Sequence, residues 1–238
     1  MNSLSIVIAL WNESQALERL FYKINKFKKK FSFKLEIIFI NDGSTDSTKD
    51  LIYKFKNNFE GKCKIISYLT NMGKGHALRK GVLLSSGDWV LTSDADLSVC
   101  LDEFLKWSKK ELMPTKIYFG SRLLKTSKLQ AKTSRKIIGN IFRLLVKILF
   151  LQNKSLSRIQ DTQCGFKLYH KNYAKKIFLA SVEKKFLQDI EIVLLADMYK
   201  IDIIEMPVTW IYGNKSSINF IFDPIIMLVG LFRLKFRF

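Results

Sequence analysis

Short apolar runs alternate with amphipathic stretches along the first half of the chain. The apolar runs are rich in β-branched residues and bounded by polar turn residues, so they predict strands. The amphipathic stretches place apolar residues three and four positions apart, which predicts helices. The expected strands are residues 4–10, 35–40, 64–69, 89–92 and 116–119, and the expected helices are about 13–29, 46–57, 75–85 and 101–110.

Strands that alternate with helices are typical of βαβ units. Such units predict the α/β class, with a mostly parallel sheet and helices on both of its faces. Ligands of these sheets bind beyond the carboxyl ends of the strands. The residues that directly follow each strand are therefore the first candidates for a functional site.

Acidic residues follow three of the expected strands. Glu13 comes after the first, Asp42 after the second, and Asp94 and Asp96 after the fourth. We expect these four carboxylates to converge on one edge of the sheet. Two carboxylates two residues apart favour a hard cation, because Mg²⁺ binds through one or two carboxylates plus substrate phosphates. Capping of the following helix is the alternative interpretation of Asp94 and Asp96.

Two other polar segments have simpler interpretations. Turn formation and helix capping account well for Asn41, Ser44 and Asp46. The segment Gly73-Lys74-Gly75 allows close approach of the backbone at a helix start, where anions bind. It is not a Walker A loop, and a plain helix entry explains it equally well.

Composition and charge narrow the class of protein. The chain has 238 residues, 48% of them hydrophobic and 13% aromatic, which excludes a disordered protein. The 40 basic and 21 acidic residues give a net charge of +19. Residues 122–176 hold fourteen of the basic residues and one acidic residue, Asp161. Such a block attracts nucleic acid, anionic lipids or phosphorylated substrates; the alternative is a generally lysine-rich surface.

Membrane contact is expected without a spanning helix. The longest run without charge, residues 1–12, is too short to cross a bilayer, and no secretory signal opens the chain. Residues 136–151 predict a helix with a narrow polar stripe, which would lie in a membrane interface through Phe142, Leu145 and Leu149. A core helix is the equal alternative. Residues 223–238 add a second amphipathic, basic segment.

Several motifs together resemble glycosyltransferase family 2. The resemblance implies the glycosyltransferase-A fold, which is Rossmann-like, and a nucleotide-sugar donor. The motifs, in the family's order and spacing, are Ser5-Ile-Val-Ile-Ala-Leu-Trp-Asn-Glu13, Asn41-Asp-Gly-Ser-Thr-Asp46, Asn71-x-Gly-Lys-Gly-x-Ala-x-Arg79, Asp94-Ala-Asp96 and Gly120-Ser-Arg122.

Downstream motifs resemble the polyprenyl-phosphate branch of that family, and within it the dolichyl-phosphate β-glucosyltransferases. The resemblance covers residues 4–216, which we expect to form the catalytic domain, with residues 217–238 as a tail. Two departures are Ala9-Leu10-Trp11 in place of the family's Pro-Ala/Thr-Tyr, and the lack of the family's membrane anchors. The downstream motifs are Asp161-Thr-Gln-Cys-Gly-Phe-Lys167, Asp189-x-Glu191, Glu205-x-Pro-Val-x-Trp210 and Gly213-x-Lys215.

The resemblance also implies roles for individual residues. Arg122 and Arg135 would receive the acceptor phosphate, and Asp96 would ligate Mg²⁺ or Mn²⁺. The catalytic set would be Asp94, Asp96, Arg122 and Asp189, with Asp189 acting either as a base or as an orienting group. The donor-binding set would be Ala9, Trp11, Glu13, Asp42, Lys74, Asp94, Ala95, Asp96 and Lys215.

These expectations define one main hypothesis. The chain would be an inverting transferase that moves a hexose, with glucose from UDP-glucose favoured, onto a polyprenyl phosphate at the cytoplasmic face of a membrane. An acceptor phosphate is largely dianionic at neutral pH and needs no strong base. Transfer to a sugar hydroxyl is the alternative within enzymes. A nucleic-acid-binding module is disfavoured, because strand-end carboxylates would repel phosphates, and no nucleic acid is expected as a partner. Whether the chain forms a homo-oligomer is left open.

Overall fold

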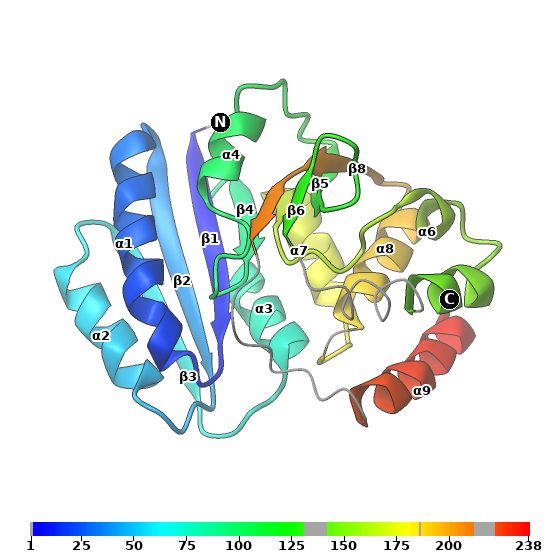
Figure 1. Ribbon diagram of the computed structural model, residues 1–238, viewed down its shortest axis with the longest axis horizontal. Coiled ribbons are helices and arrows are strands. Elements are labelled where there is room, and N and C mark those ends of the chain that lie inside the picture. Colours follow the sequence, from blue (N-terminus) through cyan, green and yellow to red (C-terminus); the bar gives the residue numbers. More distant parts are fainter. Residues whose placement is uncertain (1, 131–141, 186, 212–221) are drawn as a thin grey trace.

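The computed structural model describes residues 2–130, 142–185, 187–211 and 222–238. A seven-stranded sheet of order β3-β2-β1-β4-β7-β5-β8 forms its centre (Figure 1). A two-stranded sheet pairs β6 with β9. The strands are β1 (Ser3–Leu10), β2 (Lys34–Asp42), β3 (Lys62–Tyr68), β4 (Trp89–Ser93), β5 (Lys116–Ser121), β6 (Lys128–Gln130), β7 (Lys167–His170), β8 (Asp202–Pro207) and β9 (Thr209–Ile211).

The sheet is mostly parallel. The pairs β1–β2, β1–β4, β2–β3 and β5–β8 are all parallel, and β7 alone runs antiparallel to both of its neighbours, β4 and β5. The helices are α1 (Ser14–Lys30), α2 (Thr48–Asn58), α3 (Lys74–Leu83), α4 (Asp102–Trp107), α6 (Lys154–Arg158), α7 (Lys171–Ala180), α8 (Gln188–Met198) and α9 (Phe222–Arg237). Residues 142–149 form one further helix, called helix 142–149 below.

Each face of the sheet buries its own apolar cluster, because successive side chains of a strand point to opposite faces. Leu4, Ile6 and Ile8 of β1 pack into a first cluster with residues of α1, α2 and α4. Val7 of the same strand joins a second cluster with residues of α3, α7 and α8. The predicted α/β class, with a mostly parallel sheet and helices on both faces, is therefore confirmed.

Helix 142–149 divides its apolar residues between the protein and the surface. Val146 and Phe150 are buried in the second cluster, and Phe142 and Leu149 pack against it. Of the two interpretations left open for this helix, core packing therefore holds for Phe142 and Leu149, whose side chains cover the second cluster. Leu144, Leu145, Ile148 and Leu151 are the exposed apolar residues of this segment.

The C-terminal helix packs on the same cluster. Leu231 and Leu234 of α9 are buried there, and Figure 1 shows α9, in red, on the side of the molecule that carries α6 and α8, away from α1 and α2. Among the described residues, no helix is both long enough and apolar enough to cross a bilayer.

Candidate active site

The carboxyl ends of three adjacent parallel strands bring the first candidate residues to one edge of the sheet. Leu10 at the end of β1 is in register with Asn41 of β2, and Ile8 of β1 with Ser93 of β4. Trp11 therefore follows β1 at the same edge where Asp94 follows β4. The indole of Trp11 is 45% exposed, so it is accessible to a ligand above this edge.

Asp42 anchors the loop that leads into α3. One of its carboxylate oxygens accepts a hydrogen bond from the backbone N–H of Met72 and the other from that of Gly73, both at 2.8 Å. Gly73 has φ = +99°, and a Cβ at this position would collide with the carbonyl oxygen of Lys184. The Asp42 side chain is 2% exposed, and both of its oxygens hold this loop in place. The expected part of Asp42 in donor binding stays a prediction.

The loop places Lys74, the first residue of α3, next to Asp94. The ammonium of Lys74 forms an ion pair with the carboxylate of Asp94. Burial opposes the charged forms of both groups, but the cations of Lys74, Lys167 and Arg122 still hold the pKa of Asp94 below its usual range. Gly165 lies against this carboxylate, and a Cβ there would collide with it. The Gly in the motif 161–167 is thus required by a close approach to Asp94.

Asp96 lies in the turn after β4 and is suited to bind a metal ion. Its carboxylate accepts hydrogen bonds from the backbone N–H of Ser98 at 2.8 Å and from its hydroxyl at 2.6 Å, which leaves further lone pairs on both oxygens. Within the described residues, no group of three or more His, Cys, Asp and Glu could hold a metal. The remaining lone pairs of the Asp96 carboxylate fit Mg²⁺ or Mn²⁺ bound through one carboxylate and the phosphates of a substrate.

A second and more deeply buried ion pair lies beside the first. Lys167 of β7, whose side chain is 1% exposed, forms an ion pair with Asp189 at the start of α8. Its ammonium also lies 4.7 Å from the ring centre of Phe119. Burial lowers the pKa of Lys74, but the charges of Asp94 and Asp189 raise it above its usual value. The carboxylate of the second ion pair therefore also stabilises the charged form of Lys74.

Arg122 is held by a third carboxylate. Its Nε and Nη2 donate to the two oxygens of Asp161 at 2.7 and 2.8 Å, and its backbone N–H donates to Asp161 at 2.9 Å. Burial raises the pKa of Asp161, but the Arg122 guanidinium outweighs it and holds that pKa below its usual range. This bidentate pair uses one edge of the guanidinium and fixes the plane in which its other edge lies.

The expected turn and capping residues take those roles. Asp46 accepts hydrogen bonds from the backbone N–H of Ser14 at 3.1 Å and of Thr48 at 3.0 Å, so it ties the starts of α1 and α2 together. These bonds lower its pKa to about 2, although burial alone would raise it. Two other candidates, Arg135 and Lys215, lie outside the described residues.

No pattern in the sequence indicated Lys167 as a functional residue. The available signal was a single charged residue in the apolar run Phe166–Tyr169, in a segment where no strand was predicted. A charged side chain within a buried strand is rare unless it is paired. Its partner Asp189 was predicted, but the pair joins residues 22 positions apart, and no local pattern indicates that contact.

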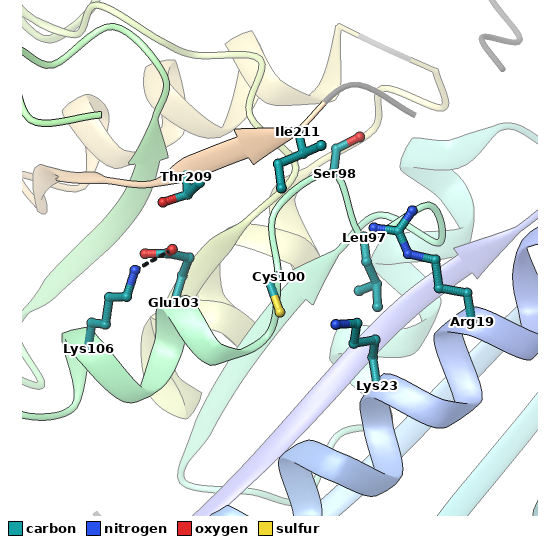
Figure 2. A pocket seen from close by; sticks show the side chains of 9 residues that line it. All are labelled: Arg19, Lys23, Leu97, Ser98, Cys100, Glu103, Lys106, Thr209 and Ile211. Carbon is teal, nitrogen blue, oxygen red and sulfur yellow. Dashed lines mark hydrogen bonds and ion pairs between the residues drawn. The ribbon is translucent and has the colours of Figure 1, made fainter. Parts of the chain in front are cut away.

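A pocket of about 320 Å³ borders the turn that follows Asp96 (Figure 2). Its walls come from α1, α4 and β9 and from the segment that follows Asp96. Figure 2 shows Arg19 and Lys23 of α1 extending towards Leu97, and Lys106 paired with Glu103. None of these basic residues was predicted as part of the site.

Comparison with known proteins identifies related chains. The model of "Glycosyl transferase family 2" matches residues 5–178. A dolichyl-phosphate β-glucosyltransferase of Dictyostelium discoideum is 32% identical over 99% of this chain and 74% of its own length. The enzymes of that name from Homo sapiens (32%, covering 89% and 69%) and Saccharomyces cerevisiae (33%, covering 96% and 72%) are similarly related.

Solved structures share the fold at low sequence identity. Glucosyl-3-phosphoglycerate synthase from Mycobacterium tuberculosis in complex with UDP superposes with a TM-score of 0.70 at 13% identity, covering 98% of this chain and 80% of the synthase. A mannosyltransferase from Pyrobaculum calidifontis in complex with GDP-Man and Mn²⁺ gives 0.60 at 15% identity, covering 90% of this chain and 58% of its own. The expected glycosyltransferase-A fold is confirmed.

Proposed function

The chain belongs to glycosyl transferase family 2 and is a hexosyltransferase that uses a nucleotide sugar, and we propose that it moves glucose from UDP-glucose onto a polyprenyl phosphate. The relatives named dolichyl-phosphate β-glucosyltransferase, which align with nearly all of this chain, support both the sugar and the class of acceptor. Polyprenyl phosphates are anchored in lipid, so we place the reaction at the cytoplasmic face of a membrane.

The observation that carries the choice of acceptor is the ion pair between Asp189 and Lys167. A general base must accept a proton from the acceptor, and Asp189 is the residue that would do so for a sugar hydroxyl. One oxygen of this carboxylate is already engaged by a buried ammonium. The arrangement suits an acceptor that arrives as an anion and attacks without losing a proton, such as a phosphate monoester.

Donor binding would use the edge of the sheet where β1, β2 and β4 end. Ala9, Trp11 and Glu13 would line the base and ribose, with Asp42 holding the loop that presents Lys74. The ammonium of Lys74 would stabilise the negative charge that develops on the leaving diphosphate. Asp94 would orient Lys74 and face the ribose or the sugar.

Asp96 would hold Mg²⁺ or Mn²⁺, which when bound supplies further positive charge to the diphosphate. Arg122, fixed by Asp161, would bind the acceptor phosphate and aim its oxygen at the anomeric carbon, with Arg135 as a second cation. Direct attack from the face opposite the leaving group inverts the configuration of that carbon. Lys215 would bind the donor phosphate from the late loop.

A donor and acceptor screen tests this proposal. The protein is incubated with radiolabelled UDP-glucose, UDP-galactose, GDP-mannose or UDP-N-acetylglucosamine, together with Mn²⁺ and a polyprenyl phosphate, and label in the organic phase is measured. We expect label from UDP-glucose alone to enter the lipid. Transfer to an oligosaccharide hydroxyl, with no labelled lipid, would contradict the proposal and support the alternative acceptor.

A further inference from the structure

Exposed apolar residues are concentrated on one part of the molecule. Among the described residues, twenty large apolar side chains are exposed, and eleven of them lie in residues 144–151, 179–182 and 228–238. We call these eleven side chains the α9 surface. A concentration of this kind on a soluble domain marks a surface that binds a partner or a membrane.

The three segments are held together by described contacts. Leu231 and Leu234 of α9 share a buried cluster with Val146 and Phe150 of the segment around helix 142–149. Arg237 of α9 donates to the backbone carbonyl of Ala180 at 2.9 Å. All three segments therefore border the same buried cluster, and α9 is bonded directly to the segment 179–182.

The outer face of α9 follows a helical period. Val229, Phe232 and Phe236 are exposed at spacings of three and four residues, so they lie along one side of the helix. The Phe236 side chain is 89% exposed. Leu231 and Leu234 occupy the opposite side and are buried. Their packing fixes the orientation of α9, so the apolar outer face is a defined feature of the folded helix.

The charges in this region are of one sign. Residues 142–160 contain four basic residues and no acidic residue, and residues 224–238 contain three basic residues and no acidic residue. Arg233 and Arg237 form ion pairs with Glu183 and Glu191, and the exposed lysines of this region are Lys147, Lys154 and Lys235. An apolar face with exposed lysines is complementary to an anionic bilayer, into which apolar side chains insert while the cations meet head groups. Two copies of this face would instead bring like charges together, which disfavours self-association.

We propose that the α9 surface docks onto an anionic lipid bilayer and holds the enzyme at the membrane. This inference rests on the proposed function, since it supplies the contact that brings the donor site to a lipid-anchored acceptor. Two ion pairs connect the surface to that site. Arg233 pairs with Glu183 and Arg237 with Glu191, and Glu191 accepts hydrogen bonds from the backbone N–H groups of Val182 and Glu183 at 2.9 Å.

The same loop supports the donor side. The carbonyl oxygen of Lys184 accepts a hydrogen bond from the backbone N–H of His76, two residues after Lys74. The Gln188 side chain donates to the carbonyl of Gly75 at 2.7 Å. The docking surface and the donor loop are thus parts of one packed unit, so a bilayer bound at α9 has a defined position relative to Lys74.

Co-sedimentation with vesicles tests the surface. The full chain is mixed with vesicles of phosphatidylcholine and phosphatidylserine at 7:3, and with phosphatidylcholine alone. The variant Val229→Ser/Phe232→Ser/Phe236→Ser should lower the partition coefficient for the anionic vesicles about tenfold or more. The control Tyr22→Ser/Tyr53→Ser/Leu84→Ser removes three exposed large side chains elsewhere and should bind as the parent does.

Separate readouts distinguish a failed surface from a failed function. With a short, water-soluble polyprenyl phosphate, the α9 variant should keep the parent's transfer rate, while transfer to long-chain lipid in vesicles falls with binding. Absence of transfer in the parent would reject the proposed function and leave the vesicle result intact. If the triple variant unfolds, Phe236→Ser alone, at an 89% exposed position, should still weaken binding measurably. Unchanged vesicle binding by a folded variant, or a parent dimer that the variant abolishes, would overturn the proposal.

Discussion

Replacing Arg122 by lysine separates the charge of this side chain from its shape. The guanidinium donates from Nε and Nη2 to both oxygens of Asp161, and this bidentate contact fixes the plane of the group. A lysine keeps the positive charge but offers a single ammonium on a flexible stem, so it cannot hold Asp161 and a phosphate in one fixed geometry.

The size of the effect follows from the number of bonds lost. A hydrogen bond to a charged group contributes about 1.5–3 kcal/mol, so losing one contact to the acceptor phosphate should lower kcat/KM for the acceptor roughly 10- to 100-fold. The stability should change less. The lysine ammonium keeps a positive charge beside Asp161, so the loss is that of about one hydrogen bond, roughly 1 kcal/mol, which lowers Tm by roughly 2–4 °C.

The assay compares the acceptor dependence of transfer with UDP affinity measured by calorimetry. Arg122→Lys should raise the acceptor KM or lower kcat while the Kd for UDP stays within about twofold. Lys125→Ala, an exposed residue of the same basic block, is the matched control and should change neither quantity. Equal losses in UDP affinity and acceptor efficiency would refute the assignment and place Arg122 on the donor side.

Other parts of the site and the fold give three further predictions. Asp96→Asn should abolish transfer and metal-dependent UDP binding while circular dichroism stays unchanged; turnover by the folded variant in EDTA would contradict this. Asp189→Asn should keep at least about a tenth of the turnover with a phosphate acceptor, whereas loss of a true base costs about 10²- to 10⁴-fold. Glu36 is buried, which raises its pKa, but hydrogen bonds from Ser5 and Ser86 outweigh this and lower it from 4.5 to about 2. Its contribution, on the order of 3 kcal/mol, is therefore present above pH 4.5 and lost as the pH falls towards 2. Urea unfolding should show that this dependence on pH is flattened in Glu36→Gln.

The sequence predicted the first half of the fold because its signals are local. The strands β1 to β4 and the helices between them each carry a hydrophobic period that is visible within one short window. The strand β7 has four residues, Lys167–His170, and its place between β4 and β5 depends on pairing with segments far away in the chain. A four-residue run with a lysine in it has no distinctive period, so no strand was predicted there.

In the site too, single residues could be predicted from nearby sequence, whereas the contacts between distant residues could not. The strand ends indicated Asp94 and Asp96, and the family resemblance added Arg122 and Asp189. Their partners could not be predicted in this way. Lys74 lies 20 residues from Asp94, and Arg122 lies 39 residues from Asp161, so these contacts follow from the fold and not from any local pattern.

The described basic residues of the block 122–176 occupy two different environments in the folded protein, which a generally lysine-rich surface does not explain. Arg122 and Lys167 are inside the site, where Asp161 and Asp189 neutralise them. Arg143 and Lys147 belong to helix 142–149, whose exposed apolar residues are part of the α9 surface. A surface that is basic only for solubility would have no reason to bury Lys167 at 1% exposure, because an unpaired ammonium there would be strongly unfavourable. Under the proposed function, the internal cations would serve the transfer of the sugar, and the external ones would meet the lipid surface.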